Sequence, residues 1–164
     1  SDGKWMSSQG ATGVLLFGKS AKAASTIQAQ FIDHSIKKYY LAILRGYLPK
    51  AHGMIDHPLA KDLEFVLQEA KTEYWTLKQC QIRRHFAHLR HYIIGDTTHG
   101  DNRQNNFFSS QFQLENMLLH AWELTFFQPF SKESITIKAD LPLHFLSIMR
   151  EFNWPEKELS NHLV

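Results

Sequence analysis

Alternating apolar and polar residues in the C-terminal third are the feature that most restricts the fold of this chain. Residues 119–127 and 135–139 show a period of two, which is typical of strands with one buried face, and Pro129 ends the first segment. After Asp140 the apolar spacing becomes helical, so we expect Asp140 to cap a helix that has Pro142 in its first turn. Strands that feed directly into a helix predict a domain of the α+β class.

The rest of the chain extends the same pattern. We expect a strand at 12–19 with a fully apolar centre buried on both faces, and further strands at 38–48, 54–59, 72–77 and 92–94. Ser20 should cap a helix from Ala21 to about Ser35, whose core face would hold Ala24, Ile27 and Phe31. The face predicted for the last helix is Leu141, Phe145, Ile148, Met149 and Phe152. Residues 97–110 are polar and rich in asparagine, and we expect a surface loop there. The fold class predicted is α+β, with a mixed, mostly antiparallel sheet flanked by helices.

Composition excludes several classes of protein. A hydrophobic content of 43% in 164 residues is typical of a packed globule and not of a disordered chain. No apolar run approaches the ~20 residues that span a bilayer, and residues 1–10 lack a signal-peptide pattern. Cys80 is the single cysteine, which suits a reducing compartment, so we expect a cytoplasmic protein with no membrane contact. The net charge of +2 permits nucleic-acid binding without demanding it.

Residues 81–101 concentrate arginines and histidines around a short apolar stripe. Ile82, Phe86 and Leu89 recur at helical spacing, which predicts an amphipathic helix over 82–91, followed by a turn at Gly95 and Asp96. This basic stretch leaves three kinds of chemistry open: a metal site, a nucleophilic cysteine, and nucleic-acid binding.

Two of these readings are weak. The metal site would use His85, His88 and His91, but the first and last diverge by about 120° around a helix, and neighbouring arginines would repel a cation. Cys80 precedes the helix, which could lower its pKa, yet no glycine-rich elbow or orienting acid accompanies it. RNA binding explains more residues, because cations contact phosphates and aromatic rings stack on unpaired bases. The cations are Lys37, Lys38, Arg45, Arg83, Arg84, Arg90 and Arg103, interleaved with Tyr39, Tyr40 and Phe86.

An ordered set of motifs resembles the pseudouridine synthases that modify ribosomal and transfer RNA. The matching segments are TGVLLFGKS (12–20), KKYYLAILRG (37–46), HPLAKD (57–62), TEY (72–74), QIRRHFAHLRHYIIGD (81–96), LLHAWEL (118–124) and ITIKADLP (135–142). They occur in the family order and cover most of the chain. The segment THGDNRQN (98–105) is similar to the branch of the family that acts on transfer RNA.

The resemblance implies a reaction and a set of site residues. A uridine is turned out of its helix, an aspartate attacks the nucleotide, the N-glycosidic bond breaks, and C5 bonds to C1′ without any metal or cofactor. Tyr40 matches the catalytic tyrosine that stacks under the base, and Arg83 matches the arginine that pairs with the aspartate. Gly95 and Asp96 match a structural turn, and His120 matches a position that supports the site through the fold. The expected RNA contacts are Lys37, Lys38, Arg84, Arg90 and Arg103, in a monomer that binds tRNA.

Two features depart from the family pattern. Counting back from Gly13 without gaps, the position of the family's aspartate falls at Ser8, and none of residues 5–9 matches its motif. At 78–80 the chain runs almost directly into Gln81, where the family has a hairpin, and the family's N-terminal strands are absent too. We therefore expect a single catalytic domain over 1–164 that lacks those strands and that hairpin. Three explanations of these departures remain open: an inactive RNA-binding relative, an internally deleted product, or the parts of a longer protein joined across gaps. We favour the third explanation.

Overall fold

The structure is a computed structural model that describes residues 10–46, 48, 50–56, 59–60, 67–68, 71–77, 91–154 and 156. The chain divides into two compact units. One comprises Ser1–Arg45 and Tyr92–Met149, and the other comprises Gly46–His91 and Arg150–Val164. The candidate site that can be built from described residues lies in the first unit.

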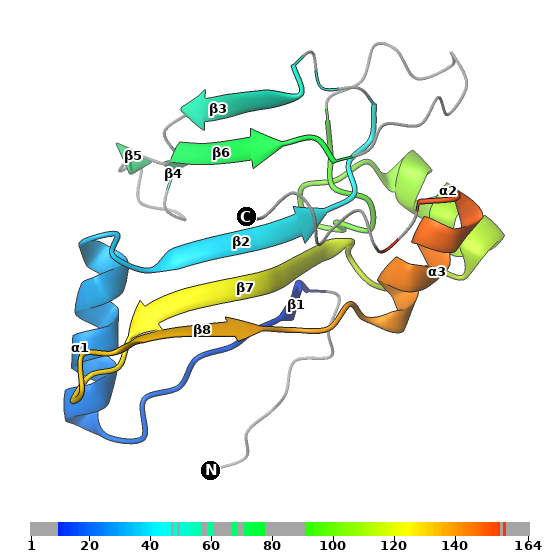
Figure 1. Ribbon diagram of the computed structural model, residues 1–164. Helices are drawn as coiled ribbons and strands as arrows, with labels where there is room; N and C mark the ends of the chain where they lie inside the picture. The colour runs from blue at the N-terminus through cyan, green and yellow to red at the C-terminus, as the bar shows by residue number, and fades with distance from the viewer. Residues whose placement is uncertain are drawn as a thin grey trace. The chain divides into compact units, whose positions relative to one another are not determined.

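Strand β7 (Leu119–Phe127) is the centre of the sheet in the first unit, because every other strand of that sheet pairs with it (Figure 1). β2 (Lys37–Ala42) and β8 (Ser134–Lys138) pair with it antiparallel, and the short β1 (Thr12–Gly13) pairs parallel. The buried residues of β7 are His120, Leu124 and Phe126, all at even positions, so one face of the strand packs against the core. The predicted mixed, mostly antiparallel sheet with helices is confirmed.

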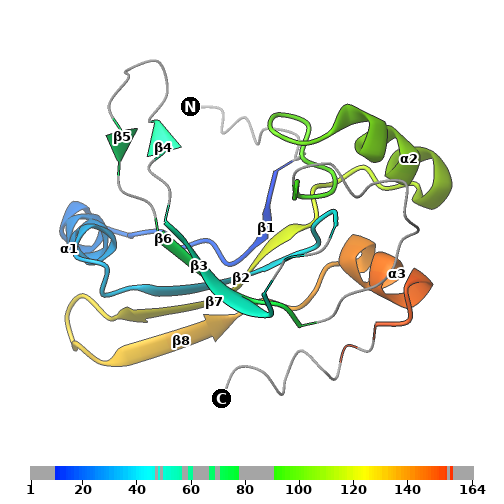
Figure 2. The ribbon, with the colours of Figure 1, turned by 90° about the horizontal axis from the view of Figure 1, so that it is seen from above.

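Helix α1 (Ala21–Ile32) lies at the end of the sheet where β7 finishes, and helix α3 (Leu143–Glu151) lies beyond the opposite end (Figures 1 and 2). As predicted, Ser20 caps α1, and its side chain accepts a hydrogen bond from the N–H of Ala23 at 3.2 Å. Ile27 packs in a core cluster with Ile36, Leu124 and Phe126. The Gln30 amide donates to the carbonyl of Phe127 at 2.7 Å and accepts from its N–H at 2.8 Å, which fastens α1 to the end of β7.

The predicted core face of α1 was right at Ile27 but wrong by one residue at Ala24 and Phe31. Ala23, Ile27 and Gln30 are buried, whereas Ala24 is exposed and the Phe31 side chain is 41% exposed. The two hydrogen bonds between Gln30 and Phe127, which we call the Gln30 clasp, explain the difference. They require Gln30 to face the sheet, and this orientation of α1 turns Phe31 away from the core.

The predicted strand at 12–19 is also wrong in its extent. Only Thr12 and Gly13 form strand β1, and Leu15 and Phe17 are 69% and 71% exposed. After Thr12 and Gly13, one more hydrogen bond joins the chain to β7, from the Val14 N–H to the Ala121 carbonyl. From Glu123 onward, β8 pairs with the edge of β7 that β1 uses. The segment after Val14 therefore has no strand edge left to join.

Three strands meet at Ala121, which pairs with Gly13 on one side and with Tyr40 on the other. Gly13 has φ +114°, and a Cβ built on it would stand 2.1 Å from the Ala121 carbonyl oxygen. Only glycine permits this close approach of β1 to β7. On the other side, the register of β2 shifts between Tyr39 and Tyr40, which pair with Glu123 and Ala121. This β-bulge re-aims the side chains at the junction.

The chain that leaves β2 is held by main-chain hydrogen bonds to residues 92–94. Leu44 bridges Ile93, and the N–H of Arg45 donates to the Tyr92 carbonyl at 3.0 Å. The strand predicted at 92–94 is thus reduced to one bridge, but Ile94 is buried as expected, with 1% exposure.

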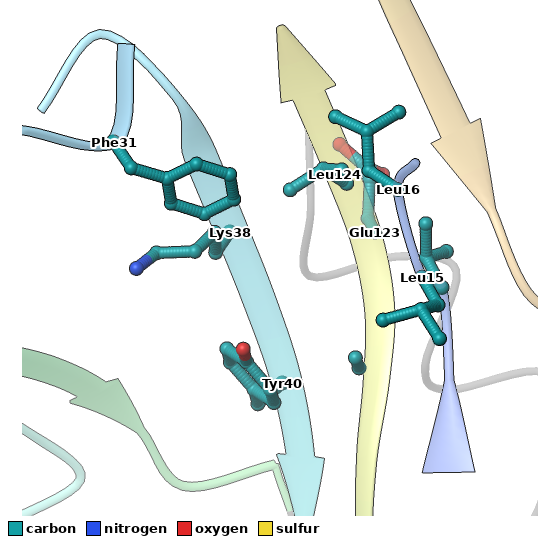
Figure 3. Close-up of a pocket in the computed structure, with 9 residues that line it drawn as sticks. Leu15, Leu16, Phe31, Lys38, Tyr40, Glu123 and Leu124 are labelled. Carbon is teal, nitrogen blue, oxygen red and sulfur yellow. The ribbon is translucent and has the colours of Figure 1, made fainter. Parts of the chain in front are cut away.

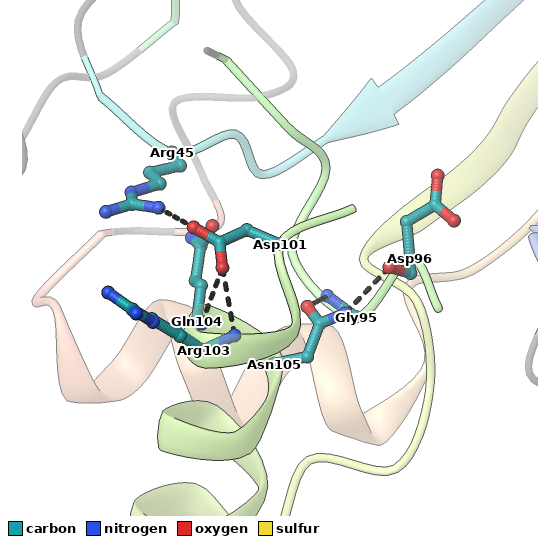
Figure 4. Close-up of polar contacts among 7 residues, drawn as sticks. All are labelled: Arg45, Gly95, Asp96, Asp101, Arg103, Gln104 and Asn105. Carbon is teal, nitrogen blue, oxygen red and sulfur yellow. Dashed lines mark hydrogen bonds and ion pairs between the residues drawn. The ribbon is translucent and has the colours of Figure 1, made fainter. Parts of the chain in front are cut away.

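Helix α2 (Asn102–Phe112) replaces the surface loop predicted at 97–110. Asp101 caps it by accepting from the N–H groups of Arg103 and Gln104 at 2.9 and 3.4 Å. The other carboxylate oxygen of Asp101 accepts from the guanidinium of Arg45, whose side chain is only 5% exposed (Figure 4). The polar composition concealed this helix because its buried face is narrow, with Gln104 and Phe108 as its buried residues.

Helix α3 (Leu143–Glu151) buries Phe145, Ile148 and Met149 as predicted. The predicted start of this helix was wrong, because it begins at Leu143, directly after Pro142. The Pro142 carbonyl accepts from the N–H groups of Phe145 and Leu146, so Pro142 precedes the helix and Asp140 does not cap it. Leu141 and Phe152 are half-buried.

The second unit contains two antiparallel strand pairs. β3 (His52–Asp56) pairs with β6 (Lys71–Trp75), and β4 (Leu59–Ala60) pairs with β5 (Leu67–Gln68). The strand predicted at 72–77 is confirmed as β6, and the one predicted at 54–59 is divided between β3 and β4. The helix predicted at 82–91 lies outside the described residues, except for His91. Within the described part of the chain, no helix is both long and apolar enough to cross a membrane.

We predict that Gly13→Ala destabilises the fold by roughly 3 kcal/mol, because a side chain there meets the Ala121 carbonyl and adopts an unfavourable φ. Urea denaturation measures the change. Gly10→Ala is the matched control, since a Cβ at Gly10 has nothing within 4 Å. Equal stability of the two variants would contradict the close approach of β1 to β7.

We predict that Asp101→Asn destabilises the protein by roughly 3 kcal/mol, because asparagine keeps the helix cap but removes the negative charge that faces the buried Arg45 guanidinium. Burial raises the pKa of Asp101, but the two backbone N–H donors and the Arg45 charge together lower it by more. The pKa of Asp101 therefore lies below its ordinary value. A lowered pKa makes the carboxylate's contribution complete above about pH 4 and lost as the pH falls through the folded-state pKa.

The stability difference between the parent protein and Asp101→Asn should therefore shrink below about pH 4 in chemical denaturation measured across pH. Asp33→Asn is the control, because the Asp33 carboxylate is exposed, accepts from the N–H of Ser35, and has the exposed His34 beside it in place of a buried guanidinium. A loss for Asp33→Asn as large as that for Asp101→Asn would contradict the role of the ion pair.

Candidate functional site

A groove of about 170 Å³ opens beside the junction of β1, β7 and β2. Phe31, Lys38 and Tyr40 line one side of it, Leu15 and Leu16 line the other, and β7 runs between them (Figure 3). The remaining lining residues are Val14, Ala121, Glu123 and Leu124. The groove therefore has one aromatic and cationic side and one aliphatic side, which suits a flat, partly apolar ligand that carries a negative charge nearby.

Tyr40, the predicted catalytic tyrosine, lies in this groove with 54% of its surface exposed. Its partner across the sheet is Ala121, whose methyl group is too small to cover a tyrosine ring. An exposed aromatic ring with a small neighbour is available for stacking against another planar group. Tyr39, the next residue, is half-buried and does not line the groove.

The charges of the groove come from one lysine and one carboxylate. The ammonium group of Lys38 stands 5.4 Å from the centre of the Phe31 ring. Glu123 has a side chain that is 14% exposed, and its carboxylate pairs with Lys138 at 3.0 Å. The negative charge of Glu123 is therefore compensated from β8. Lys37 is exposed on the same strand but does not line the groove.

The predicted turn at Gly95 and Asp96 is a fixed structural element (Figure 4). Gly95 has φ +83°, and a Cβ there would stand 2.5 Å from the carbonyl oxygen of Asn116. The Asn105 amide accepts from the Gly95 N–H at 2.9 Å and donates to the Asp96 carbonyl at 2.7 Å. Arg103 is exposed in the first turn of α2. These contacts hold α2 and the turn together, and none of the residues that make them lines the groove.

His120 lies in the core and not in the groove, with 2% of its surface exposed. Its Nδ1 is 2.8 Å from the Thr12 hydroxyl, and its Nε2 is 3.3 Å from the Ala139 carbonyl. Because Nε2 faces a carbonyl oxygen, it donates there, and in the neutral tautomer with this arrangement Nδ1 accepts from the Thr12 hydroxyl. His120 thus ties β1 to β7 next to the groove.

Sequence reasoning missed Phe31 and Glu123 as groove residues. It assigned Phe31 to the core, and Glu123 was only one position in an alternating strand. The burial pattern Ala23, Ile27, Gln30 also has helical spacing. The side-chain amide of Gln30 was the signal that could have shown Phe31 to face the groove. An amide can hydrogen-bond both the N–H and the carbonyl at the end of a strand, so Gln30 could replace Phe31 on the side of α1 that faces the sheet.

Several predicted residues lie outside the described part of the chain. They are Ser8, Cys80, Arg83, Arg84, His85, His88 and Arg90. Their roles, the missing hairpin at 78–80 and the extent of the single domain stay predictions. Among the residues that the structure does describe, no three His, Cys, Asp or Glu side chains are grouped so that they could hold a metal ion.

Comparison with known proteins agrees with the fold and the motifs. Residues 9–81 match the family model described as RNA pseudouridylate synthase. The chain is 33% identical to tRNA pseudouridine synthase C of Vibrio cholerae over 187 aligned positions, which cover 92% of this chain and 76% of the relative. It is 32% identical to tRNA pseudouridine synthase C of Salmonella typhi, covering 87% of this chain and 69% of the relative. The first alignment is longer than the chain, so that relative holds residues without a counterpart here.

A solved structure supports the same fold. The protein described as Human RNA Pseudouridylate Synthase Domain Containing 1 superposes with a TM-score of 0.53 at 17% sequence identity, covering 81% of this chain and 70% of that chain. Sequence identity near one third over most of both chains, together with the motifs in their expected order, confirms the resemblance. The chain therefore belongs to the RNA pseudouridylate synthase family, a family of isomerases.

Proposed function

We propose that this protein isomerises a specific uridine of transfer RNA to pseudouridine, and that the uridine is turned out of its helix into the groove lined by Tyr40. The relatives that carry the name tRNA pseudouridine synthase C support transfer RNA as the substrate. The observation that carries the proposal is the exposed Tyr40 ring in a groove built where β1, β7 and β2 meet.

The reaction moves one bond and needs no added atoms. The bond from N1 to C1′ breaks, the uracil turns over, and a bond from C5 to C1′ forms. The C5 proton leaves and a proton is gained at N1, so no redox cofactor or metal is required by the balance. Tyr40 stacks against the base and assists removal of the C5 proton. Turning the base out of its helix costs a few kcal/mol, which stacking in the groove offsets.

The electrostatic part of the site is assigned to residues outside the described ones. Arg83 would hold a carboxylate ionised and aimed at the nucleotide. The position that corresponds to this carboxylate is Ser8, and a serine hydroxyl neither ionises near neutral pH nor forms a charge pair with arginine. This substitution is the reason for keeping an alternative function, an RNA-binding relative without turnover, which tritium release from labelled tRNA distinguishes from the enzyme.

The contacts to RNA are assigned to exposed cations. Lys37, Lys38 and Arg103 are exposed in the structure, and Arg84 and Arg90 belong to the basic stretch that precedes the Gly95 turn. We infer a monomer that acts in the cytoplasm, without cofactor or metal. Gly95, Asp96 and His120 support the site through the fold.

We predict that the protein releases tritium from unmodified tRNA transcript that carries uridine labelled at C5, because pseudouridine formation removes that hydrogen. Tyr40→Phe keeps the stacking ring but loses the hydroxyl, and we expect kcat to fall roughly 100-fold with little change in KM. Tyr39→Phe is the matched control, since Tyr39 does not line the groove, and it should retain the parent rate. Equal rates for both variants would contradict the role of Tyr40.

We predict that Ser8→Asp raises the rate of tritium release, because it supplies the carboxylate that Arg83 is expected to hold. Asp2→Asn is the control and should leave the rate unchanged, since Asp2 is out of register with the family motif. If the parent protein binds tRNA and neither it nor Ser8→Asp releases tritium, the enzyme proposal fails and the RNA-binding alternative stands.

A further inference from the structure

We propose that Phe31 and Lys38 form a second nucleotide subsite in the groove, which holds the nucleotide next to the target uridine. The neighbouring base would stack at Phe31, and its phosphate would bind Lys38. This inference rests on the proposed function, because it takes RNA as the ligand of the groove.

Phe31 is a large aromatic side chain that the fold leaves in solvent at the edge of a groove. The Gln30 clasp on Phe127 fixes the rotation of α1, so Phe31 cannot enter the core. Its side chain is 41% exposed and lines the groove together with Tyr40 from β2. Exposed aromatic rings that share a groove are the arrangement that proteins use to stack successive bases of a single strand.

Lys38 supplies a positive charge at the same place. Its ammonium group lies 5.4 Å from the centre of the Phe31 ring, so the two side chains form one cation–aromatic unit. In the described residues, no carboxylate forms an ion pair with Lys38, and the carboxylate of Glu123 in the groove is already paired with Lys138. The charge of Lys38 is therefore available to a phosphate.

The spacing along β2 suits two consecutive nucleotides. Lys38 and Tyr40 are two residues apart and both line the groove, so their Cα atoms are separated by about 7 Å. Tyr40 would hold the target base and Lys38 the phosphate of the next nucleotide, so the two contacts fall on adjoining parts of a strand that is spread open around the turned-out uridine.

The chain offers a matched control pair, of which Lys22 also lies on α1 and Phe130 lies in the turn after β7. Lys22 of α1 lies 5.9 Å from the centre of the Phe130 ring, which is 61% exposed, and neither residue lines the groove. This second pair has the same chemistry and comparable exposure. Any loss that reflects general charge or surface hydrophobicity should appear equally in variants of both pairs.

The test measures the affinity of fluorescein-labelled hexauridylate by fluorescence anisotropy, with circular dichroism confirming that each variant is folded. We expect Phe31→Leu to weaken binding roughly tenfold, and Lys38→Gln to weaken it and to reduce the slope of log affinity against log salt by about 0.7. Lys22→Gln and Phe130→Leu should bind like the parent protein. Parent-like binding by Phe31→Leu and Lys38→Gln, equal losses in both pairs, or no binding of the parent protein would each overturn the subsite.

The tritium-release assay separates this inference from the proposed function. In tRNA turnover, Phe31→Leu should raise KM with kcat retained, because the subsite holds the strand and does not touch the reacting atoms. If the parent protein binds hexauridylate through Phe31 and Lys38 but releases no tritium, the subsite stands and the enzyme proposal fails. If tritium is released at the parent KM by Phe31→Leu, the subsite fails and the enzyme proposal stands.

Discussion

The main-chain pairing of Ala121 on β7 is the constraint on which the candidate site depends. Gly13 of β1 approaches one edge of this residue, and Tyr40 of β2 pairs with the other. The approach of β1 requires a residue without a side chain at Gly13, and the hydrogen bond between Thr12 and the buried His120 holds the same junction. The position of the Tyr40 ring relative to the segment after β1 is thus set by backbone geometry and one buried histidine.

The groove exists because β7 cannot pair with β1 and β8 at the same positions. β8 occupies the edge from Glu123 onward, so the apolar segment after Gly13 leaves the sheet with Leu15 in solvent. At the other side of the groove, the Gln30 clasp turns Phe31 outward. Both exposures place apolar surface next to Tyr40, and contiguous exposed apolar surface in a folded protein marks a site of binding.

Much of this fold could be predicted from the sequence, and the failures have physical causes. Local signals found β7 at its observed bounds, the Ser20 cap and the buried face of α3, because each depends on a short pattern of apolar residues or one capping side chain. Helix α2 was missed because its stability comes from the Asp101 cap and the contact with Arg45, a residue distant in sequence. Tyr40 was found through a motif, whereas Phe31 was misplaced because pairing between Gln30 and β7 decided its direction.

The central claim is that the Tyr40 groove receives a uridine of transfer RNA. Photocrosslinking tests it most directly, with tRNA transcribed with 4-thiouridine, irradiated in the complex and digested for mass spectrometry. The account predicts crosslinked uridine on peptides that contain Tyr40 or Leu15, which face each other across β7. Crosslinks confined to peptides that contribute no residue to the groove, such as α2, would contradict it.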